Sequence, residues 1–350
     1  MEIPSRMGRG ALACGRLAFY AGILGVLTCV VAGCRGGCTR DGSRTSKVVV
    51  AQWGQEKYLI YLPVYVAMEK GFFKDEGLEV SLTYSGNDDQ VFASVLQGGS
   101  QFGVGDPVFT AIANEKAGNL GKVVASIVGG VAIWGVTNQD SIPVIESKSQ
   151  LAGLRVGTFP APSTNYTLMA DTITSGGAEL HSTKIVQAPI GGQIALLEGK
   201  QADIAMVLEP AASLAEAKGY RVVFSSPKFY GAFAFTGLTV STRYANEHPE
   251  VVQGMVKGVQ RALDYCHSDP EGASTVARQL FPSLEPAVVD KAVRRMVSES
   301  TLPKSVVVSE DSWSAALKTR ITVGDLKALQ PYHHSVDMSF ADAAIRDKAE

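Results

Sequence analysis

The sequence predicts an α/β protein with two similar lobes, each a mostly parallel sheet flanked by helices. Apolar strands alternate with helices over residues 47–128 and again over residues 151–225, which is typical of doubly wound sheets. In both series a short apolar strand follows a helix and a glycine, then stops at an acid and a proline, as at 102–107 and 204–210. Because proline cannot continue a central strand, each acid is expected at the carboxyl end of a strand, the edge where open α/β sheets bind ligands.

Two extended segments, 131–138 and 233–242, are rich in β-branched and aromatic residues. We expect them to be the two strands that cross between the lobes and act as a hinge. The first lobe would then comprise residues 47–133 plus 240–350, and the second lobe residues 134–239.

Local signals define the elements of the first lobe. Pro63 lies near the start of a helix that Gly71 stops, Asn87 or Asp88 is a candidate cap, and residues 78–84 alternate as in a half-buried strand. In order, we expect a strand at 47–53, a helix at 63–70, a turn at 72–77, a strand at 78–84, a helix through residue 96, a strand at 102–105, a helix at 107–117 and a strand at 122–128.

Glycines bound the elements of the second lobe. Gly199 is expected to take the left-handed conformation at the end of a short helix, and the apolar run 204–208 to form a strand buried on both faces. The other expected elements are strands at 154–159, 183–188 and 220–225 and helices at 163–175 and 211–218. Helices at 248–267, 270–280, 286–298 and 309–319 are expected to pack back on the first lobe, before a surface tail at 332–350.

Composition and charge restrict the classes of function. Hydrophobic residues make up 46% of the 350 residues and charged residues 19%, which indicates a globular protein. The net charge of −2 and the lack of a basic run argue against a nucleic-acid partner. The sequence contains no G-x-S-x-G, P-loop or dinucleotide-binding motif, and the adjacent His333 and His334 cannot share a helix face. We therefore expect no catalytic residues, no cofactor and no metal.

The N-terminus is expected to be a lipoprotein signal peptide, residues 1–33. Three arginines precede the uncharged apolar stretch 17–33, and residues 31–34, Val-Ala-Gly-Cys, resemble a bacterial lipobox. Cleavage would place a lipid on the thiol of Cys34, and residues 34–46 would form a flexible tether. An ordinary signal peptide or a membrane anchor are the alternatives. Cys38 and Cys266 remain after cleavage, and we expect them to stay unpaired.

Three motifs resemble the solute-binding proteins of ABC importers. Residues 67–80, AMEKGFFKDEGLEV, are similar to the family pattern A-x-x-x-G-F/Y-F-x-x-E-G-L-x-V. Residues 151–157, LAGLRVG, are similar to L-x-G-K-x-I/V-G. Residues 195–210 resemble a third motif, in which a tryptophan often stands where this chain has Leu208. The subgroup takes nitrate, sulfonates, taurine, bicarbonate and pyrimidine precursors of thiamine.

The resemblance implies a type II periplasmic-binding-protein-like fold, in which ligand closes two lobes by a hinge motion. It also implies a non-enzymatic, exported, monomeric protein. Its partners would be a small-molecule ligand, an ABC permease with its ATPase, and a bacterial membrane reached through the lipid anchor. The competing classes are an enzyme of pyrimidine metabolism on the same fold and a ligand-sensing domain.

Candidate ligand-binding residues lie near the expected strand ends and hinge. Aromatic side chains there can stack on a planar ligand, or can simply pack between the lobes. They are Trp53, Tyr58, Tyr61, Trp134, Tyr230 and Phe233. The start of the helix at 163–175 can present free amide donors to a ligand, or can be a plain cap. It holds Ser163, Thr164, Asn165 and Tyr166.

Asp106 and Glu209, the two strand-end acids, complete the candidate site. They can accept hydrogen bonds from ligand N–H groups, or can cap the helices that follow. Lysine and arginine are scarce in the same loops. The acids and aromatics therefore favour a planar nitrogen heteroaromatic, such as a pyrimidine- or flavin-type vitamin precursor, over nitrate, taurine or an alkylsulfonate.

Overall fold

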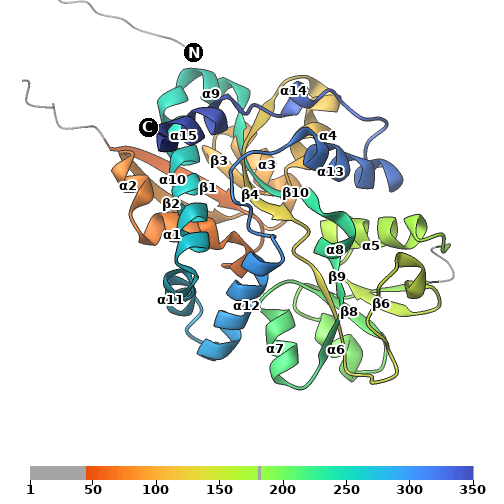
Figure 1. Ribbon diagram of the computed structural model, residues 1–350. Coiled ribbons are helices and arrows are strands. Elements are labelled where there is room, and N and C mark those ends of the chain that lie inside the picture. Colours follow the sequence, from red (N-terminus) through yellow and green to blue (C-terminus); the bar gives the residue numbers. More distant parts are fainter. Residues whose placement is uncertain (1–44, 180–182, 350) are drawn as a thin grey trace, which may run out of the picture. The chain divides into compact units, whose positions relative to one another are not determined.

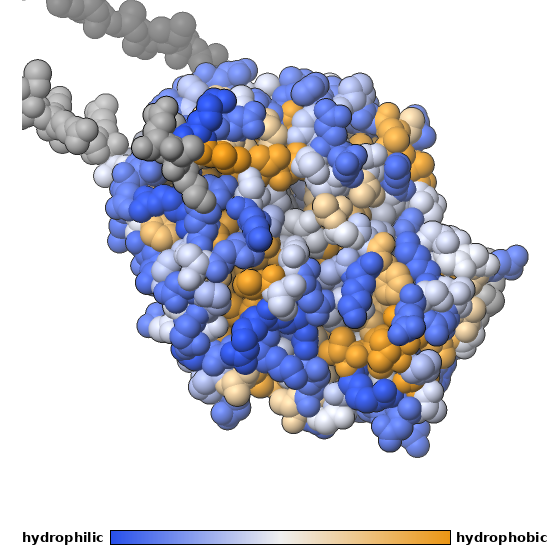
Figure 2. Space-filling model, in the orientation of Figure 1, coloured by the Kyte–Doolittle hydropathy of each residue, from blue (hydrophilic) through white to orange (hydrophobic). Residues whose placement is uncertain are grey.

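The structure is a computed structural model that describes residues 45–179 and 183–349. The expected signal peptide, Cys34, Cys38 and nearly all of the expected tether lie outside the described residues. No helix in the described part of the chain is long and apolar enough to cross a membrane. Charged and polar side chains cover most of the face in Figure 2, interrupted by apolar patches.

The first sheet has the strand order β2-β1-β3-β10-β4 (Figure 1). Its strands are β1 (Ser46–Gln52), β2 (Leu78–Tyr84), β3 (Phe102–Gly105), β4 (Gly121–Gly130) and β10 (Ala232–Ser241). β1 pairs in parallel with β2 and β3, whereas β10 runs antiparallel between β3 and β4. Every residue of β3 is buried, as expected for a strand inside a sheet that is covered on both faces.

The helices of this sheet start and end near the predicted signals, apart from two short ones that were not predicted. They are η1 (Leu59–Tyr61), α1 (Leu62–Glu69), α2 (Phe72–Asp75), α3 (Asp88–Gln97) and α4 (Val108–Ala117). Asn87 caps α3 in a capping box with Gln90, which decides between the two predicted caps. The turn predicted at 72–77 is wrong, because Gly71 takes a positive φ of 76° and the chain re-enters a helix at once, as α2.

The second sheet has the order β7-β6-β8-β5-β9. Its strands are β5 (Trp134–Thr137), β6 (Arg155–Thr158), β7 (Lys184–Gln187), β8 (Ile204–Val207) and β9 (Arg221–Ser225), and its helices are η2 (Lys148–Leu151), α5 (Thr164–Ser175), α6 (Gln193–Glu198), α7 (Ala211–Ala217) and α8 (Ser226–Tyr230). β8 is buried throughout, as predicted. The prediction for Gly199 is wrong: its φ is −79°, and Lys200, with φ 55°, takes the left-handed conformation instead.

The predicted two-lobed α/β fold is confirmed, and both sheets are mixed. The segment after β4 enters the second sheet as β5, antiparallel between β8 and β9. The return segment enters the first sheet as β10, also antiparallel. Each crossing strand therefore becomes an internal strand of the sheet that it reaches. The lobe boundaries remain a proposal. The chain is back in the first sheet from Ala232, where β10 begins.

The C-terminal part is helical, as predicted, but it contacts elements of both sheets. Its helices are α9 (Thr242–Glu247), α10 (Pro249–Ser268), α11 (Pro270–Leu280), α12 (Pro286–Ser298), α13 (Glu310–Thr322), α14 (Tyr332–Ser335) and α15 (Ser339–Ala349). α10 packs on α1 and α15, whereas α12 contacts α7 and α13 contacts both β10 and α5 (Figure 1). The predicted packing on the first lobe is present in α10 and α13, and α12 and α13 make contacts with the second lobe in addition.

The surface tail predicted at 332–350 is also wrong where the chain is described. Val336 forms a parallel bridge with Val123 of β4, and Asn114 Nδ2 donates to Ser335 Oγ at 3.0 Å. Ser335, Val336 and Ala341 are buried. These contacts anchor α14 and α15 on the first sheet, which the short helical signals of this segment did not indicate.

Candidate ligand-binding site

An inner cavity of about 40 Å³ lies where the carboxyl ends of strands from both sheets meet. The first sheet contributes the residues after β1 and β3, and the second contributes those after β6 and β8. Six of the predicted site residues line this cavity: Trp53, Tyr61, Asp106, Ser163, Thr164 and Asn165. Two outer pockets share lining residues with it, among them Trp53 and Asp88 on one side and Phe159 and Leu208 on the other. The inner cavity thus adjoins a wider hollow.

Aromatic side chains form much of the inner wall. Trp53, Tyr61, Phe159 and Phe235 all line it. Tyr58 lines the outer pockets, and its ring lies 4.8 Å from that of Trp53 at a tilt of 54°. This approach requires a glycine at position 54, whose φ is 92° and whose added Cβ would come within 2.2 Å of the Tyr58 ring. Of the predicted aromatic residues that follow β1, Trp53 and Tyr61 therefore line the inner cavity, whereas Tyr58 lines the two outer pockets.

The N-terminus of α5 forms the opposite wall. Ser163 is the cap, because its Oγ accepts the backbone N–H of Tyr166 at 3.3 Å. Asn165 is only 3% exposed, and its Nδ2 donates to the Met206 carbonyl at 3.4 Å. Because that carbonyl only accepts, the amide nitrogen must face it, and Oδ1 is the atom that remains without this contact. Asn165 Oδ1 is buried and has no hydrogen-bond partner in the described part of the chain. The Tyr166 side chain does not line the cavity.

Asp106 is hydrogen-bonded within the protein, as the capping alternative describes. Its Oδ1 caps α4 by accepting the N–H of Val108 at 2.9 Å, and its Oδ2 accepts from Thr164 Oγ1 at 2.7 Å and from Arg320 Nη2 at 2.7 Å. Arg320, on α13, is 1% exposed and also donates to the Pro162 carbonyl at 3.1 Å. Lysine and arginine are scarce in the neighbouring loops, but a cation reaches this acid from the distant helix α13.

Asp88 is a cavity residue that sequence reasoning missed as a site residue. It is the first residue of α3 and lines both the inner cavity and an outer pocket. Its Oδ1 accepts the backbone N–H of Asp106 at 2.7 Å, and the space beside Gly105 makes this approach possible, since a Cβ there would lie 2.6 Å from Oδ1. Burial and the neighbouring charge of Asp106 raise the pKa of Asp88 to about 7. In the sequence Asp88 stands beside the helix cap Asn87, and an acid at such a position usually has only a capping role.

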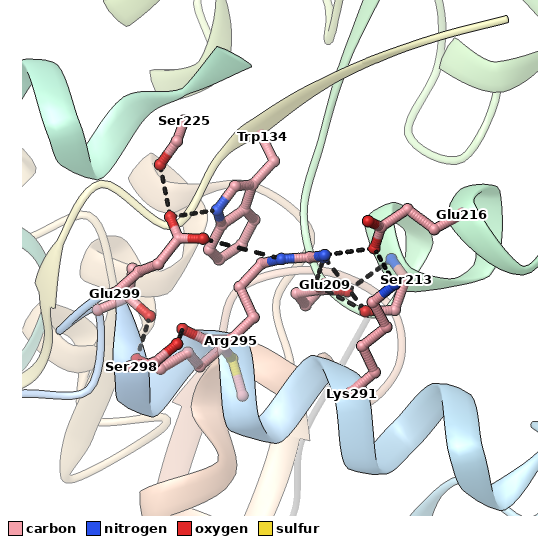
Figure 3. Close-up of polar contacts among 11 residues, drawn as sticks. Trp134, Glu209, Ser213, Glu216, Ser225, Lys291, Arg295, Ser298 and Glu299 are labelled. Atoms are coloured by element: carbon pink, nitrogen blue, oxygen red, sulfur yellow. Dashed lines mark hydrogen bonds and ion pairs between the residues drawn. The ribbon is translucent and has the colours of Figure 1, made fainter. Parts of the chain in front are cut away.

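Glu209 lies in a separate polar network (Figure 3). Its carboxylate accepts the backbone N–H of Ser213 at 3.0 Å and the Ser213 Oγ at 2.9 Å, and it pairs with Arg295 of α12. Burial raises the pKa of Glu209, and the Arg295 guanidinium opposes that rise. Arg295 also pairs with Glu216 of α7. Glu209 therefore caps α7 and ties it to α12, and it lines an outer pocket but not the inner cavity.

The last three predicted aromatics lie away from all three pockets. Trp134 Nε1 donates to Glu299 Oε2 at 2.9 Å, in the network of Figure 3. Tyr230 Oη donates to Asp171 Oδ2 at 2.7 Å, and the Phe233 ring packs edge-on against Tyr230 with centroids 5.6 Å apart. None of the three appears among the pocket-lining residues, so the packing alternative describes them better. In the described residues, no cluster of His, Cys, Asp or Glu has the arrangement of a metal site.

The sequence model of the proteins described as NMT1/THI5 like matches residues 60–273, more than half of the chain. The chain belongs to the NMT1/THI5-like family. This agrees with the family resemblance drawn from the motifs. YtlA of Bacillus subtilis (strain 168), named as a binding protein, is 25% identical to this NMT1/THI5-like chain over 320 residues, which span 89% of this chain and 93% of YtlA.

Solved structures share the fold of this NMT1/THI5-like protein. One from Bordetella bronchiseptica RB50 has a TM-score of 0.70 at 19% identity and covers 87% of this chain and 98% of its own. The alkanesulfonate-binding protein SsuA of Xanthomonas axonopodis pv. citri, bound to MOPS, has a TM-score of 0.63 at 14% identity, with 85% and 97% covered. The desulfurization enzyme DSZB has a TM-score of 0.62 at 14% identity, with 85% and 99% covered. At these identities the likeness concerns the fold alone.

Proposed function

We propose that this NMT1/THI5-like protein is the substrate-binding component of an ABC import system. It captures a small solute between two lobes, one built on the first sheet and one on the second, and delivers the solute to a permease and its ATPase. The observation that carries the proposal is the cavity between the strand ends of both sheets, with Asn165 Oδ1 unpartnered in its wall. The binding-protein name of YtlA, similar over almost its whole length, supports the same class.

The proposal includes export and a lipid anchor. The lipobox at residues 31–34 supports it, with Cys34 as the lipidated residue. A protein held at the membrane in this way stays close to its permease, which raises the effective concentration of the two partners.

The ligand that we propose is a planar nitrogen heteroaromatic, such as a pyrimidine- or flavin-type vitamin precursor. Each aromatic side chain of the inner wall that stacks on such a ring contributes about 0.5–1.5 kcal/mol. Among the described residues, the cavity lining includes two acids, Asp88 and Asp106, and neither lysine nor arginine. Arg320 already pairs with Asp106. The argument that an acid in the cavity accepts N–H groups of the ligand therefore depends on Asp88.

Nitrate, taurine and alkylsulfonates are the alternative ligands, in keeping with the SsuA fold. An oxyanion can use the amide donors at the start of α5, but Asp88 would repel it wherever the pH lies above the pKa of about 7 and the carboxylate is ionised. An enzyme of pyrimidine metabolism is the second alternative, since DSZB, named as a desulfurization enzyme, shares the fold. A binding protein and an enzyme can be distinguished by experiment, because only an enzyme would consume a bound heterocycle.

A thermal-shift screen of the purified protein tests the function. The panel contains pyrimidines, flavin fragments, nitrate, taurine and alkylsulfonates, since a ligand at 100 times its Kd stabilises the fold by about 2.7 kcal/mol. We expect heterocycles to raise the Tm, to be recovered unchanged, and to reduce the radius of gyration in X-ray scattering. A response only to nitrate, taurine or alkylsulfonates would overturn the ligand class. Consumption of the heterocycle would favour the enzyme.

A further inference from the structure

One side of α12 is held on elements of the first lobe. The helix packs on α11, which itself packs on α1, and Arg278 Nη1 of α11 donates to both carboxylate oxygens of Asp290 at 2.9 Å. Directly after α12, the Gly129 N–H at the end of β4 donates to the Thr301 carbonyl at 2.9 Å. The buried side chains of α12 are apolar: Val288, Val289, Ala292, Val293 and Met296. Apolar burial, an ion pair and a backbone hydrogen bond therefore fix α12 to the first lobe.

A second side of α12 carries charged residues that contact the second lobe. Lys291, Arg295 and Glu299 recur every four residues, so they lie along one side of the helix. Lys291 Nζ lies 2.9 Å from Glu216 Oε2 of α7 (Figure 3). Arg295 pairs with Glu216 and also with Glu209, at the start of α7. The interface between α12 and α7 is therefore built from ion pairs.

Glu299 lies where the chain crosses between the sheets. Its Oε2 accepts from Trp134 Nε1 at 2.9 Å, at the start of β5, and from Ser225 Oγ, at the end of β9. The Ser226 N–H donates to the Ile133 carbonyl at 3.1 Å, so the outgoing and returning segments are hydrogen-bonded to each other at this point. The contacts of Glu299 are therefore close to the expected pivot of the hinge, whereas the first turns of α12 lie farther from it.

The two sides of α12 differ in how easily water can cover them. Exposing the buried apolar side is unfavourable in proportion to its area. The side chains of Lys291 and Glu216 are 47% and 20% exposed, and such charged groups regain water when their pair separates. Glu209 is buried but lines an outer pocket together with Phe281 and Leu284, which precede α12, so a wider pocket would bring water to its carboxylate. When the lobes separate, the break is therefore expected between α12 and α7.

We propose that Lys291 and Arg295 of α12, with Glu209 and Glu216 as their partners, form a latch that favours the closed arrangement of the two lobes before a solute is bound. This inference deepens the proposed function and rests on it, because a latch matters only in a protein whose lobes open and close. Opening breaks the ion pairs of the latch, while the contacts of Glu299 near the pivot remain. Because the latch supplies part of the free energy of closing, a bound solute has to supply less.

Variants at the exposed end of the latch test the inference on the ligand-free protein. Lys291→Met and Glu216→Gln each remove one charge and keep a side chain of similar size, and the double variant removes both charges. Lys116→Met and Glu115→Gln make the same changes at exposed positions of α4 and are the matched controls.

Hydrogen exchange followed by mass spectrometry measures how often each segment opens. Residues 209–217 and 281–291 report on the latch itself. Residues 159–166 line the inner cavity and are not part of the latch, so faster exchange there indicates that the lobes separate. Residues 249–265 of α10 report on the stability of the whole fold.

We expect Glu216→Gln to speed exchange of the latch segments and of residues 159–166 by about threefold, the factor that corresponds to one partly exposed ion pair. Lys291→Met should act in the same direction. The double variant should resemble Glu216→Gln alone, because Lys291 acts through Glu216. Both controls should exchange like the wild type, and α10 should be unchanged in all proteins.

Three results would overturn the inference: unchanged exchange in both latch variants, faster exchange in the latch segments alone, or faster exchange that includes α10. The second would indicate local loosening without separation of the lobes, and the third a general loss of stability. None of these measurements needs a solute. A thermal-shift screen without a hit would therefore remove the proposed function, whereas any of the three results would remove the latch and leave the outcome of the screen standing.

Discussion

Arg320 Nη2 lies 2.7 Å from Asp106 Oδ2, and both side chains are almost fully buried. The same carboxylate oxygen accepts from Thr164 at the start of α5. A single guanidinium on a C-terminal helix therefore holds the strand end of the first sheet and a helix start of the second in one hydrogen-bonded cluster.

Replacing Arg320 should strongly destabilise the fold. Arg320→Leu leaves the Asp106 carboxylate buried beside Thr164 without its cation, and removing one partner of a buried pair costs about 3–5 kcal/mol. Urea unfolding measures the loss. Arg243→Leu, at an exposed arginine, is the control and should change stability by less than about 0.5 kcal/mol. A loss below about 1 kcal/mol in Arg320→Leu would show that the pair contributes little.

Glu209→Gln separates the two roles of Glu209. Its carboxylate is occupied by Ser213 and Arg295, so we expect a stability loss of about 1.5–3 kcal/mol, the range for hydrogen bonds to a charged group. Ligand affinity should stay within about threefold of the wild type. Calorimetry and urea unfolding on the same protein give both values. If affinity drops by 1.5–3 kcal/mol while stability is kept, Glu209 binds ligand as the sequence suggested.

Asp88 should make the ligand-free protein more stable as the pH falls from about 7 to about 4. Its folded pKa, about 7, lies above the ordinary value of 3.8, so the folded state binds more protons in this window and stability falls as the pH rises through it. The effect is at most about 4 kcal/mol. The groups that face Asp88 are Tyr61, Asp89, Asp106 and Arg320.

Urea unfolding at pH 5 and pH 7.5 measures this dependence. The difference in stability between the two pH values should be smaller in Asp88→Asn than in the wild type, because asparagine does not titrate. Asp311→Asn, at an exposed acid in the first turn of α13, is the control and should keep the wild-type difference. An identical pH dependence in all three proteins would mean that Asp88 ionises at its ordinary pKa.

Cys34→Ser should abolish lipidation. The thiol of Cys34 is the expected attachment point, and a hydroxyl does not replace it in the thioether. Metabolic labelling with a fatty-acid analogue should mark the wild type and not the variant, and Cys38→Ser should label like the wild type. Equal labelling of Cys34→Ser would remove the lipobox interpretation.

Local patterns predicted elements well where the signal lies within a few residues. β2, α11 and α12 have the predicted boundaries, because alternation and proline at the first helical turn are local features. The arginines that pair with Asp106 and Glu209 could not be predicted from such local patterns. Arg320 is 214 residues from Asp106 and Arg295 is 86 from Glu209, so only the tertiary fold brings them together.

The candidate site was predicted in part for the same reason. The sheet edge can be inferred from strand direction, and six predicted residues line the inner cavity. Asp88 was missed because its local context, next to the cap Asn87, explains an acid without a ligand. Trp134 lies in the crossing segment 131–138 and was a candidate for ligand contact, yet its indole is buried against Arg295 and Glu299.

Because α12 and α13 lie near the end of the chain, the contacts that they make can form only after most of the chain has been synthesised. Asp106 and Glu209 leave the ribosome long before Arg295 and Arg320, and domains generally form from the N-terminus onward. Without those helices, burial of either carboxylate would leave it without its guanidinium, which is unfavourable. The final desolvation is then a late event that waits for the C-terminal arginines, and a chain cut before residue 295 would lack both of them.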